Sequence, residues 1–107
     1  MNSIRNLLQL EDVDFTSNEE VFDEILTHKN FYIERIISYG QCSDDWYDQD
    51  LNEWLVLLDG CSTISYEDGN SVELQKGDNL LIPAHQKHKV SYTTQNPPCI
   101  WLTIFYE

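Results

Sequence analysis

The sequence predicts an all-β domain, an antiparallel sandwich or small barrel, with a short helix before its first strand. From Phe31 to the last residue, seven short segments are rich in β-branched and aromatic residues. Three of the connections, LDGC, EDGN and KGDN, place glycine where a tight reversal needs a positive φ. Short consecutive strands with such turns favour antiparallel pairing over a βαβ fold.

The length fits a single domain over residues 1–107, with an N-terminal segment at 1–30 and the β-rich part at 31–107. Ser17 and Glu20 have the spacing of a capping box before VFDEILTH, in which Val21, Ile25 and Leu26 recur at helical spacing. We therefore expect a short helix over about residues 18–28. His28 would then lie in or near its last turn, where a positive charge suits the helix dipole.

The seven expected strands are FYIERIISY, EWLVLLDG, STISYEDG, SVELQ, NLLIP, HKVSYTT and CIWLTIFY. Side chains alternate between the faces of a strand, so Glu53, Leu55 and Leu57 share one face of the second segment. Its other face, with Trp54, is apolar too, and CIWLTIFY is likewise apolar on both faces. One core cannot use both faces, so either the N-terminal segment or another subunit must cover the second. We expect a symmetric homodimer through one sheet.

Composition limits the partners and the location. Nineteen acidic residues against six basic ones give a net charge of −13, which repels nucleic acid phosphates and anionic membranes. We therefore expect neither nucleic acid nor a membrane as a partner. The chain has no apolar run of signal-peptide or membrane-spanning length, so a soluble, cytoplasmic protein is expected. Its three cysteines form no CxxC pair, which favours reduced thiols.

Two motifs resemble those of the cupin superfamily. Glu53 to Gly60 fits E(X)6G, and Gly77 to His88 fits G(X)5PX(G)XXH with Pro83 and His88 in place. Their order and the short strands between them match the small single-domain bacterial cupins of unassigned function. The resemblance implies a double-stranded β-helix, or jelly roll, that is often dimeric.

The first motif departs from the metal-binding members of that family, which carry HXH(X)3 or 4E. The four-residue spacing aligns Trp46 and Asp48 with the histidine pair, and the three-residue spacing aligns Tyr47 and Gln49. Neither register supplies a histidine. Of the family's metal ligands, only the glutamate and the second-motif histidine are present in this sequence, as Glu53 and His88. His85 occupies the position at which the second motif usually has glycine.

The resemblance leaves two interpretations of the interior. In the first, the interior holds one divalent ion, such as zinc, manganese, iron or nickel. Its ligands would be Glu53, His88 and His85, with Asp48 or Gln49 as the fourth. His85 and His88 are three residues apart around a proline turn, so their rings need not converge, and His85 can instead lie at the barrel mouth.

The second interpretation needs no metal, because a buried glutamate can be satisfied by hydrogen bonds. His88 and Arg35 are then the expected partners of Glu53, with Tyr47 and Gln49 adding polar contacts. Tyr92 shares strand parity with His88 and, as an aromatic, is a further candidate to line a small-molecule pocket.

Two functions remain open. One is a binding domain whose barrel holds a small polar ligand, with or without a metal. The other is a metal-dependent cupin enzyme of the oxygenase, isomerase or lyase type, with Tyr47 or His85 as acid or base. The missing histidines favour the binding domain, because redox chemistry at iron normally uses two or three nitrogen ligands.

Overall fold

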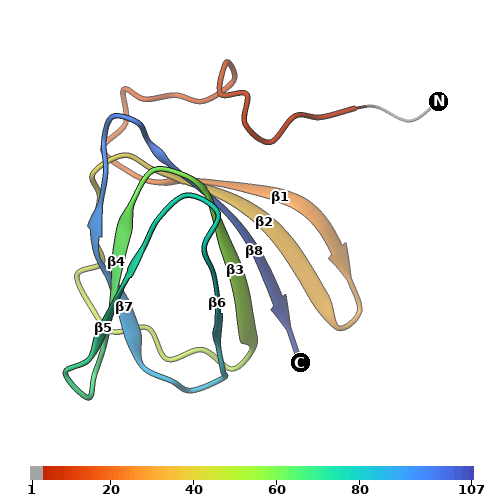
Figure 1. Ribbon diagram of the computed structural model, residues 1–107. Helices are drawn as coiled ribbons and strands as arrows, with labels where there is room; N and C mark the ends of the chain where they lie inside the picture. Colours follow the sequence, from red (N-terminus) through yellow and green to blue (C-terminus); the bar gives the residue numbers. More distant parts are fainter. Residues whose placement is uncertain (1–3) are drawn as a thin grey trace.

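The computed structural model describes residues 4–107, which form eight strands in two antiparallel sheets that face each other (Figure 1). One sheet has the order β1-β2-β8-β3-β6, and the other has the order β5-β4-β7. The strands are β1 Val21–His28, β2 Phe31–Ser38, β3 Asn52–Asp59, β4 Ser62–Tyr66, β5 Ser71–Leu74, β6 Asn79–Ile82, β7 His88–Thr93 and β8 Cys99–Tyr106. The all-β prediction and the seven strand segments from Phe31 onward are confirmed.

The predicted helix over residues 18–28 is wrong, because Val21–His28 forms strand β1 and pairs antiparallel with β2. The two strands are joined by a two-residue connection, Lys29 and Asn30. Ser17 Oγ accepts a hydrogen bond from Glu19 N within a local turn, and Glu20 accepts one from the Ser38 hydroxyl. The hydrogen bonds along the free edge of β2 outweigh the weak helical preference of this segment.

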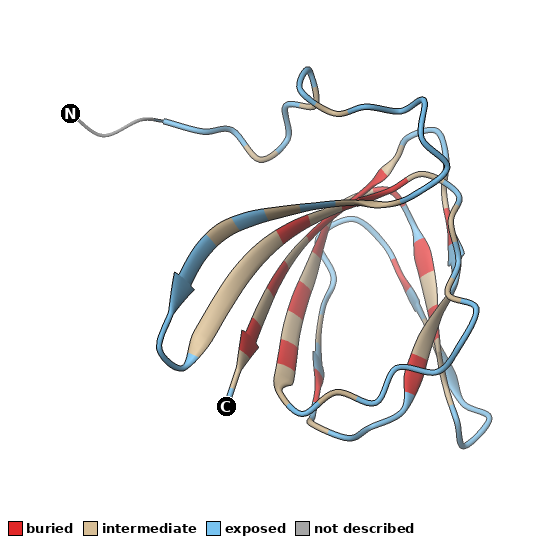
Figure 2. Cartoon of the chain, turned by 180° about the vertical axis from the view of Figure 1, so that it is seen from behind, coloured by how far each residue is buried: buried red, intermediate tan, exposed pale blue. Residues whose placement is uncertain are grey.

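The interior is built from the inward face of the larger sheet, where strand register aligns residues in rows. Tyr32, Phe105 and Glu53 form one row across β2, β8 and β3, and Glu34, Thr103 and Leu55 form the next. Figure 2 shows buried and less buried residues alternating along β3 and along much of β8. A cluster of buried apolar residues forms the core of the interior, made of Leu55, Leu57, Ile64, Leu74, Ile82, Cys99 and Trp101.

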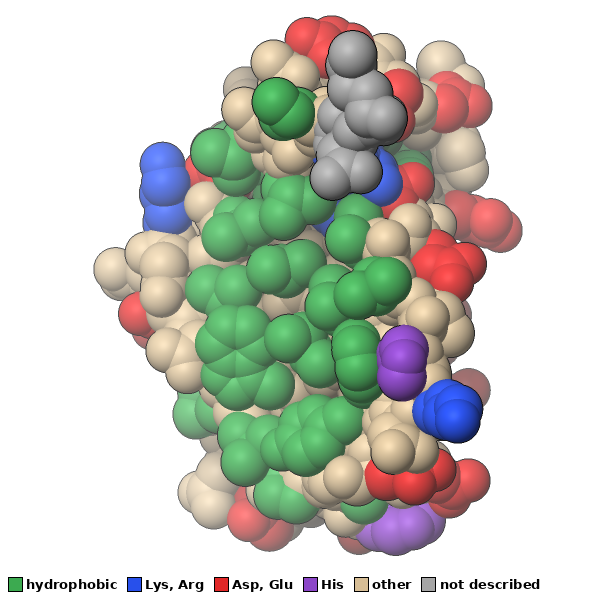
Figure 3. Space-filling view, turned by 90° about the vertical axis from the view of Figure 1, so that its right-hand side faces the viewer, with side chains coloured by type: hydrophobic (Ala, Val, Ile, Leu, Met, Phe, Trp, Pro, Cys, Tyr) green, Lys and Arg blue, Asp and Glu red, His purple; other side chains and the backbone are tan. Residues whose placement is uncertain are grey.

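The outer face of the larger sheet is covered in one part only. The segment that precedes β1 lies over this part. There the Arg35 guanidinium, 1% exposed, donates to the backbone carbonyls of Leu7 and Gln9 and to the Asp23 carboxylate. The rest of this face shows a broad patch of hydrophobic side chains (Figure 3). Leu26 and Leu81 within this face are about half exposed, at 50% and 49%. Across residues 4–107, we find no helix with the length and hydropathy needed to span a membrane.

Candidate functional site

A cavity of about 710 Å³ opens between the two sheets. Its walls come from β2, β3, β8, the end of β6 and the start of β1 on one side, and from β4, β7 and the loop before β3 on the other. The lining residues are Glu20, Phe22, Tyr32, Glu34, Ile36, Tyr47, Gln49, Asp50, Leu51, Glu53, Leu55, Ile64, Ile82, His88, Val90, Trp101, Thr103 and Phe105. This volume lies within the range of small-molecule sites, and the walls are mostly apolar with a few polar groups.

Two buried polar residues meet across the cavity. Glu53 on β3 is 6% exposed and His88 at the start of β7 is 4% exposed, so each belongs to a different sheet. Glu53 Oε1 lies 3.8 Å from His88 Nε2, which is longer than a hydrogen bond. The other ring nitrogen, Nδ1, lies 2.9 Å from the Gln86 carbonyl oxygen. Because a carbonyl only accepts, Nδ1 carries a proton and the ring orientation is set.

Burial shifts the ionisation of the Glu53 carboxyl. Desolvation raises the pKa of Glu53 to about 7, against a hydrogen bond from the Gln49 side chain that lowers it. The nearby charge of Glu34 adds to the increase. Burial also raises the pKa of Glu34 itself and that of Tyr32. The cavity is therefore an environment in which added negative charge is unfavourable.

The loop before β3 covers one side of the cavity because it pairs with β7. Tyr47 N donates to His88 O at 2.7 Å and His88 N donates to Tyr47 O at 3.1 Å, which forms an isolated antiparallel bridge. Ser43 N donates to Val90 O at 2.8 Å, further along the same strand. This pairing places Tyr47 and Gln49 on the cavity wall. Gln49 Oε1 is buried and has no hydrogen-bond partner within residues 4–107.

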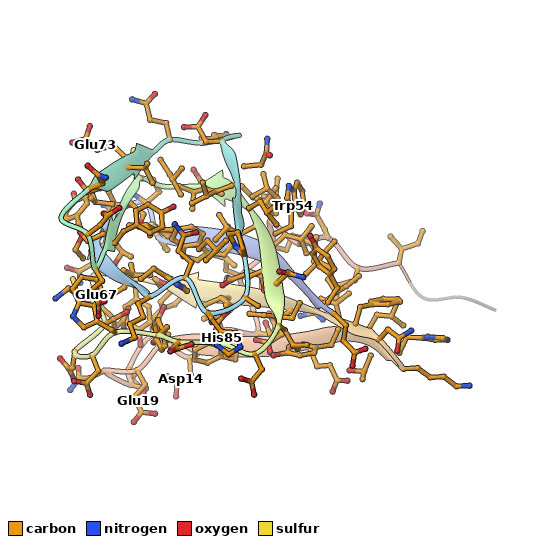
Figure 4. All side chains as sticks on the ribbon, turned by 90° about the horizontal axis from the view of Figure 1, so that it is seen from below. Asp14, Glu19, Trp54, Glu67, Glu73 and His85 are labelled. Atoms are coloured by element: carbon orange, nitrogen blue, oxygen red, sulfur yellow. The ribbon has the colours of Figure 1, made fainter. Side chains whose placement is uncertain are left out.

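His85 and Asp48 form a second, separate pair. His85 Nδ1 lies 2.8 Å from Asp48 Oδ1, and both side chains are substantially exposed. Figure 4 shows His85 at the end of the barrel nearest the viewer. His85 has a φ of +65°, which explains why glycine is usual at this position of the motif. Neither His85 nor Asp48 lines the cavity.

The four ligands proposed for a metal therefore do not meet at one point. Within residues 4–107 there is no group of three or more His, Cys, Asp or Glu side chains that could hold an ion. Of the four proposed ligands, only Glu53 and His88 line the cavity, and the predicted substitute Gln49 lies there too. The lining, drawn from residues 4–107, includes a single histidine, so it does not fit the histidine-rich metal centre of the metal-binding cupins.

Two other predicted pocket residues face away from the cavity. Arg35 lies on the outer face of β2, where its partner is Asp23 rather than Glu53. Tyr92 is 52% exposed because a bulge in β7 interrupts the alternation, so Thr63 pairs with Tyr92 while Ile64 pairs with Val90. Strand parity from His88 therefore fails beyond Val90. Trp54 is also on the outer side, donating to Asn79 Oδ1 at 3.2 Å (Figure 4).

The sequence-based interpretation missed several wall residues, chiefly Tyr32, Glu34 and Phe22. The alternation of FYIERIIS contained the information, since Tyr32 and Glu34 share a face opposite Arg35. The prediction that Arg35 is a partner of Glu53 placed the opposite face of this strand toward the interior. The segment before β1, whose backbone carbonyls bind Arg35, could not be placed from local patterns.

The comparisons with known proteins agree with this fold. The cupin domain family matches residues 36–105, which is more than half of the chain, and the chain belongs to that family. A candidate mannose-6-phosphate isomerase from Ralstonia eutropha has a similar solved structure, with 34% sequence identity, a TM-score of 0.89 and 99% of both chains covered.

Two more distant structures share the fold. A cupin superfamily protein from Desulfitobacterium hafniense has 16% identity and a TM-score of 0.78, covering 99% of this chain and 94% of that one. An RmlC-like cupin protein from Desulfovibrio desulfuricans has 20% identity and a TM-score of 0.71, covering 96% and 97%. No curated protein matches the sequence. The jelly-roll prediction and the cupin resemblance are confirmed.

Proposed function

We propose that this protein is a small-molecule binding domain whose ligand occupies the cavity between Glu53 and His88. The observation that carries the proposal is a group of polar side chains in the wall of a largely apolar cavity, one of which has a buried atom without a hydrogen-bond partner. Glu53 and His88 approach to 3.8 Å without a hydrogen bond, and Gln49 Oε1 has no partner within residues 4–107. Buried polar groups are normally hydrogen-bonded, so such groups indicate a place where a ligand supplies the missing partners.

A metal-dependent enzyme is the weaker alternative. The candidate isomerase from Ralstonia eutropha is similar over the whole chain, but the residues in the cavity supply one imidazole and one buried carboxylate. His85 and Asp48 remain outside the cavity, paired with each other. An enzyme hypothesis for this chain must therefore rest on Glu53, His88 and Tyr47 acting as acid and base rather than on metal ligation.

The binding proposal is tested by thermal unfolding in the presence of sugars, sugar phosphates, carboxylic acids, amino acids and amines. At least one compound is expected to raise the melting temperature, since a ligand that binds only the folded state stabilises it. The rise is expected to vanish in Val90→Trp, which places a larger ring at the cavity wall. Tyr92→Trp, on the outer side of the same strand, is the matched control. The absence of any rise, or an equal rise in Val90→Trp, would contradict the proposal.

We also propose that the uncovered outer face of the larger sheet binds a second copy of the chain. Its surface is mostly apolar, and charged side chains lie around the margin of the patch rather than within it (Figure 3). A second copy presents the same apolar patch, so a two-fold axis through it matches like with like. This arrangement removes the exposed side chains of Leu26 and Leu81 from water.

A further inference from the structure

The polar groups that meet in the cavity are hydrogen-bond acceptors. His88 Nδ1 donates its proton to the Gln86 carbonyl, 2.9 Å away, so in the neutral ring Nε2 presents a lone pair. That lone pair faces Glu53 Oε1 at 3.8 Å, too far for a hydrogen bond. In its ionised form, which a neighbouring cation favours, Glu53 is a second acceptor. Two acceptors facing each other gain nothing from their contact. A donor lying beside them would satisfy both.

Gln49 provides a third acceptor. Its Oε1 is buried without a hydrogen-bond partner within residues 4–107. An amide oxygen only accepts hydrogen bonds. The three acceptors come from three separate parts of the chain: β3, the start of β7 and the loop before β3. A ligand with several N–H donors would complete all of them.

The charges of the cavity have one sign. Four carboxylates line it, those of Glu20, Glu34, Asp50 and Glu53. None of the six Lys and Arg residues of the chain, all of which lie within residues 4–107, is part of the lining. Lys87 instead contacts Glu67, and Lys89 lies over the ring of Trp46. The cavity therefore attracts cations and repels anions.

Aromatic rings form much of the remaining wall. The rings of Tyr32 and Phe105 stack with centroids 4.7 Å apart, and Tyr47 lies 5.7 Å from the ring of His88. Phe22 and Trp101 complete the aromatic lining. Aromatic faces favour both apolar groups and cations. The wall thus suits a ligand with a charged head and an apolar body.

We infer that the ligand of this cavity is a primary organic amine, bound as its ammonium ion with an apolar body. This inference rests on the binding function proposed above. The three N–H groups of the ammonium donate to Glu53, His88 Nε2 and Gln49 Oε1, and the body packs against the rings of Tyr32 and Phe105. Charge-assisted hydrogen bonds of this kind are among the stronger ones.

Two other ligand classes fit less well. An inorganic cation would occupy a small part of a cavity of about 710 Å³ and would leave the aromatic wall unused. A phosphate ester would bring negative charge among four carboxylates, with no Lys or Arg within residues 4–107 placed to bind it. The sugar phosphate in the name of the Ralstonia eutropha relative is therefore not the ligand class that this cavity favours.

The test is isothermal titration with benzylamine, benzyl alcohol, benzoate, benzyl phosphate and zinc chloride at neutral pH. The four organic probes share one ring and differ in the charge of the attached group. Benzylamine is expected to bind at least tenfold more tightly than benzyl alcohol, because its ammonium group makes charge-assisted hydrogen bonds that a hydroxyl group cannot make. Benzoate and benzyl phosphate are expected not to bind.

Two variants locate the effect. Glu53→Gln is expected to lower the affinity for benzylamine at least tenfold and to change the affinity for benzyl alcohol by less than twofold. Glu73→Gln, on the exposed face of β5, is expected to change neither affinity. If benzyl alcohol or an anion binds as tightly as benzylamine and Val90→Trp blocks it, the binding function stands and the amine inference is overturned. If zinc binds more tightly than benzylamine, and both Glu53→Gln and His88→Ala abolish zinc binding, the amine inference is overturned in favour of an inorganic cation. Failure of all five probes would overturn it as well, while the wider screen still decides the binding function.

Discussion

Glu53 Oε1 and His88 Nε2 face each other 3.8 Å apart across the interior, one from each sheet of the barrel. Both side chains are more than nine-tenths buried. The glutamate of the first cupin motif and the histidine of the second are thus brought together as the family resemblance implied. The histidine pair that would complete a metal centre is replaced by a loop carrying Tyr47 and Gln49.

Glu53 is expected to make stability fall as the pH rises. Its folded pKa of about 7 lies above the ordinary value of 4.5, so the folded state holds its proton while the unfolded state loses it. The contribution is fully present below pH 4.5 and is lost as the pH rises through 7. It is of order 3 kcal/mol, since one pKa unit corresponds to about 1.4 kcal/mol.

Urea unfolding of the wild type and of Glu53→Gln at pH 4.5 and pH 8 measures this contribution. From pH 4.5 to pH 8 the free energy of unfolding of the wild type is expected to fall by about 3 kcal/mol more than that of Glu53→Gln, because the amide does not ionise. Glu73→Gln, at an exposed site, is the control and is expected to show the same fall as the wild type. An equal pH dependence in wild type and Glu53→Gln would contradict the raised pKa.

Arg35 is expected to hold the N-terminal segment against the sheet. Arg35→Met removes the buried guanidinium, so that Asp23 keeps only Arg5 as a partner within residues 4–107 and two backbone carbonyls lose their donor; this is expected to lower the free energy of unfolding by about 3 kcal/mol. Chymotrypsin is then expected to cleave faster after Phe15. Arg5→Met is the matched control, because Arg5 also contacts Asp23, at 3.3 Å, but is 43% exposed and contributes less than about 1 kcal/mol. Equal losses in the two variants would show that burial of Arg35 is unimportant.

The backbone at His85 is expected to prefer glycine. At a φ of +65° a side chain is strained, so His85→Gly is expected to be more stable than His85→Ala by about 1 kcal/mol. Both variants lose the contact with Asp48, and the comparison therefore isolates the backbone. At Gln86, which has no positive φ, the order is expected to reverse, because alanine restricts the unfolded chain more than glycine does. Denaturant midpoints of the four variants decide the question.

The dimer is expected to dissociate when a charge is placed on the outer face of the larger sheet. Wild-type protein is expected to give twice the mass of one chain in light scattering, and Leu81→Glu half of that value. Leu81 is 49% exposed, so the substitution itself is tolerated by the fold. Tyr92→Glu introduces the same charge at a site of similar exposure, 52%, on the other sheet, and is expected to remain dimeric. A monomeric wild type at micromolar concentration would contradict the proposal.

Local patterns were sufficient for the strands from Phe31 onward, since period-2 alternation and glycine turns depend on neighbouring residues alone. They were insufficient for Val21–His28, where a segment of mixed preference became a strand because β2 offered a free edge. They also failed at Tyr92, since the bulge in β7 depends on how that strand pairs with β4.

For the site, the amino-acid sequence by itself indicated that Glu53 and His88 belong to one interior, because their positions in the two cupin motifs imply it. Strand parity alone did not decide this, since the strand with Glu53 is apolar on both faces. Only the tertiary structure decided what surrounds them. The loop before β3 pairs with β7 and so places Gln49 in the cavity wall. Arg35 is on the outer face, where it binds backbone carbonyls of the segment before β1. Both outcomes depend on contacts between residues far apart in the chain, whose geometry no local periodicity encodes.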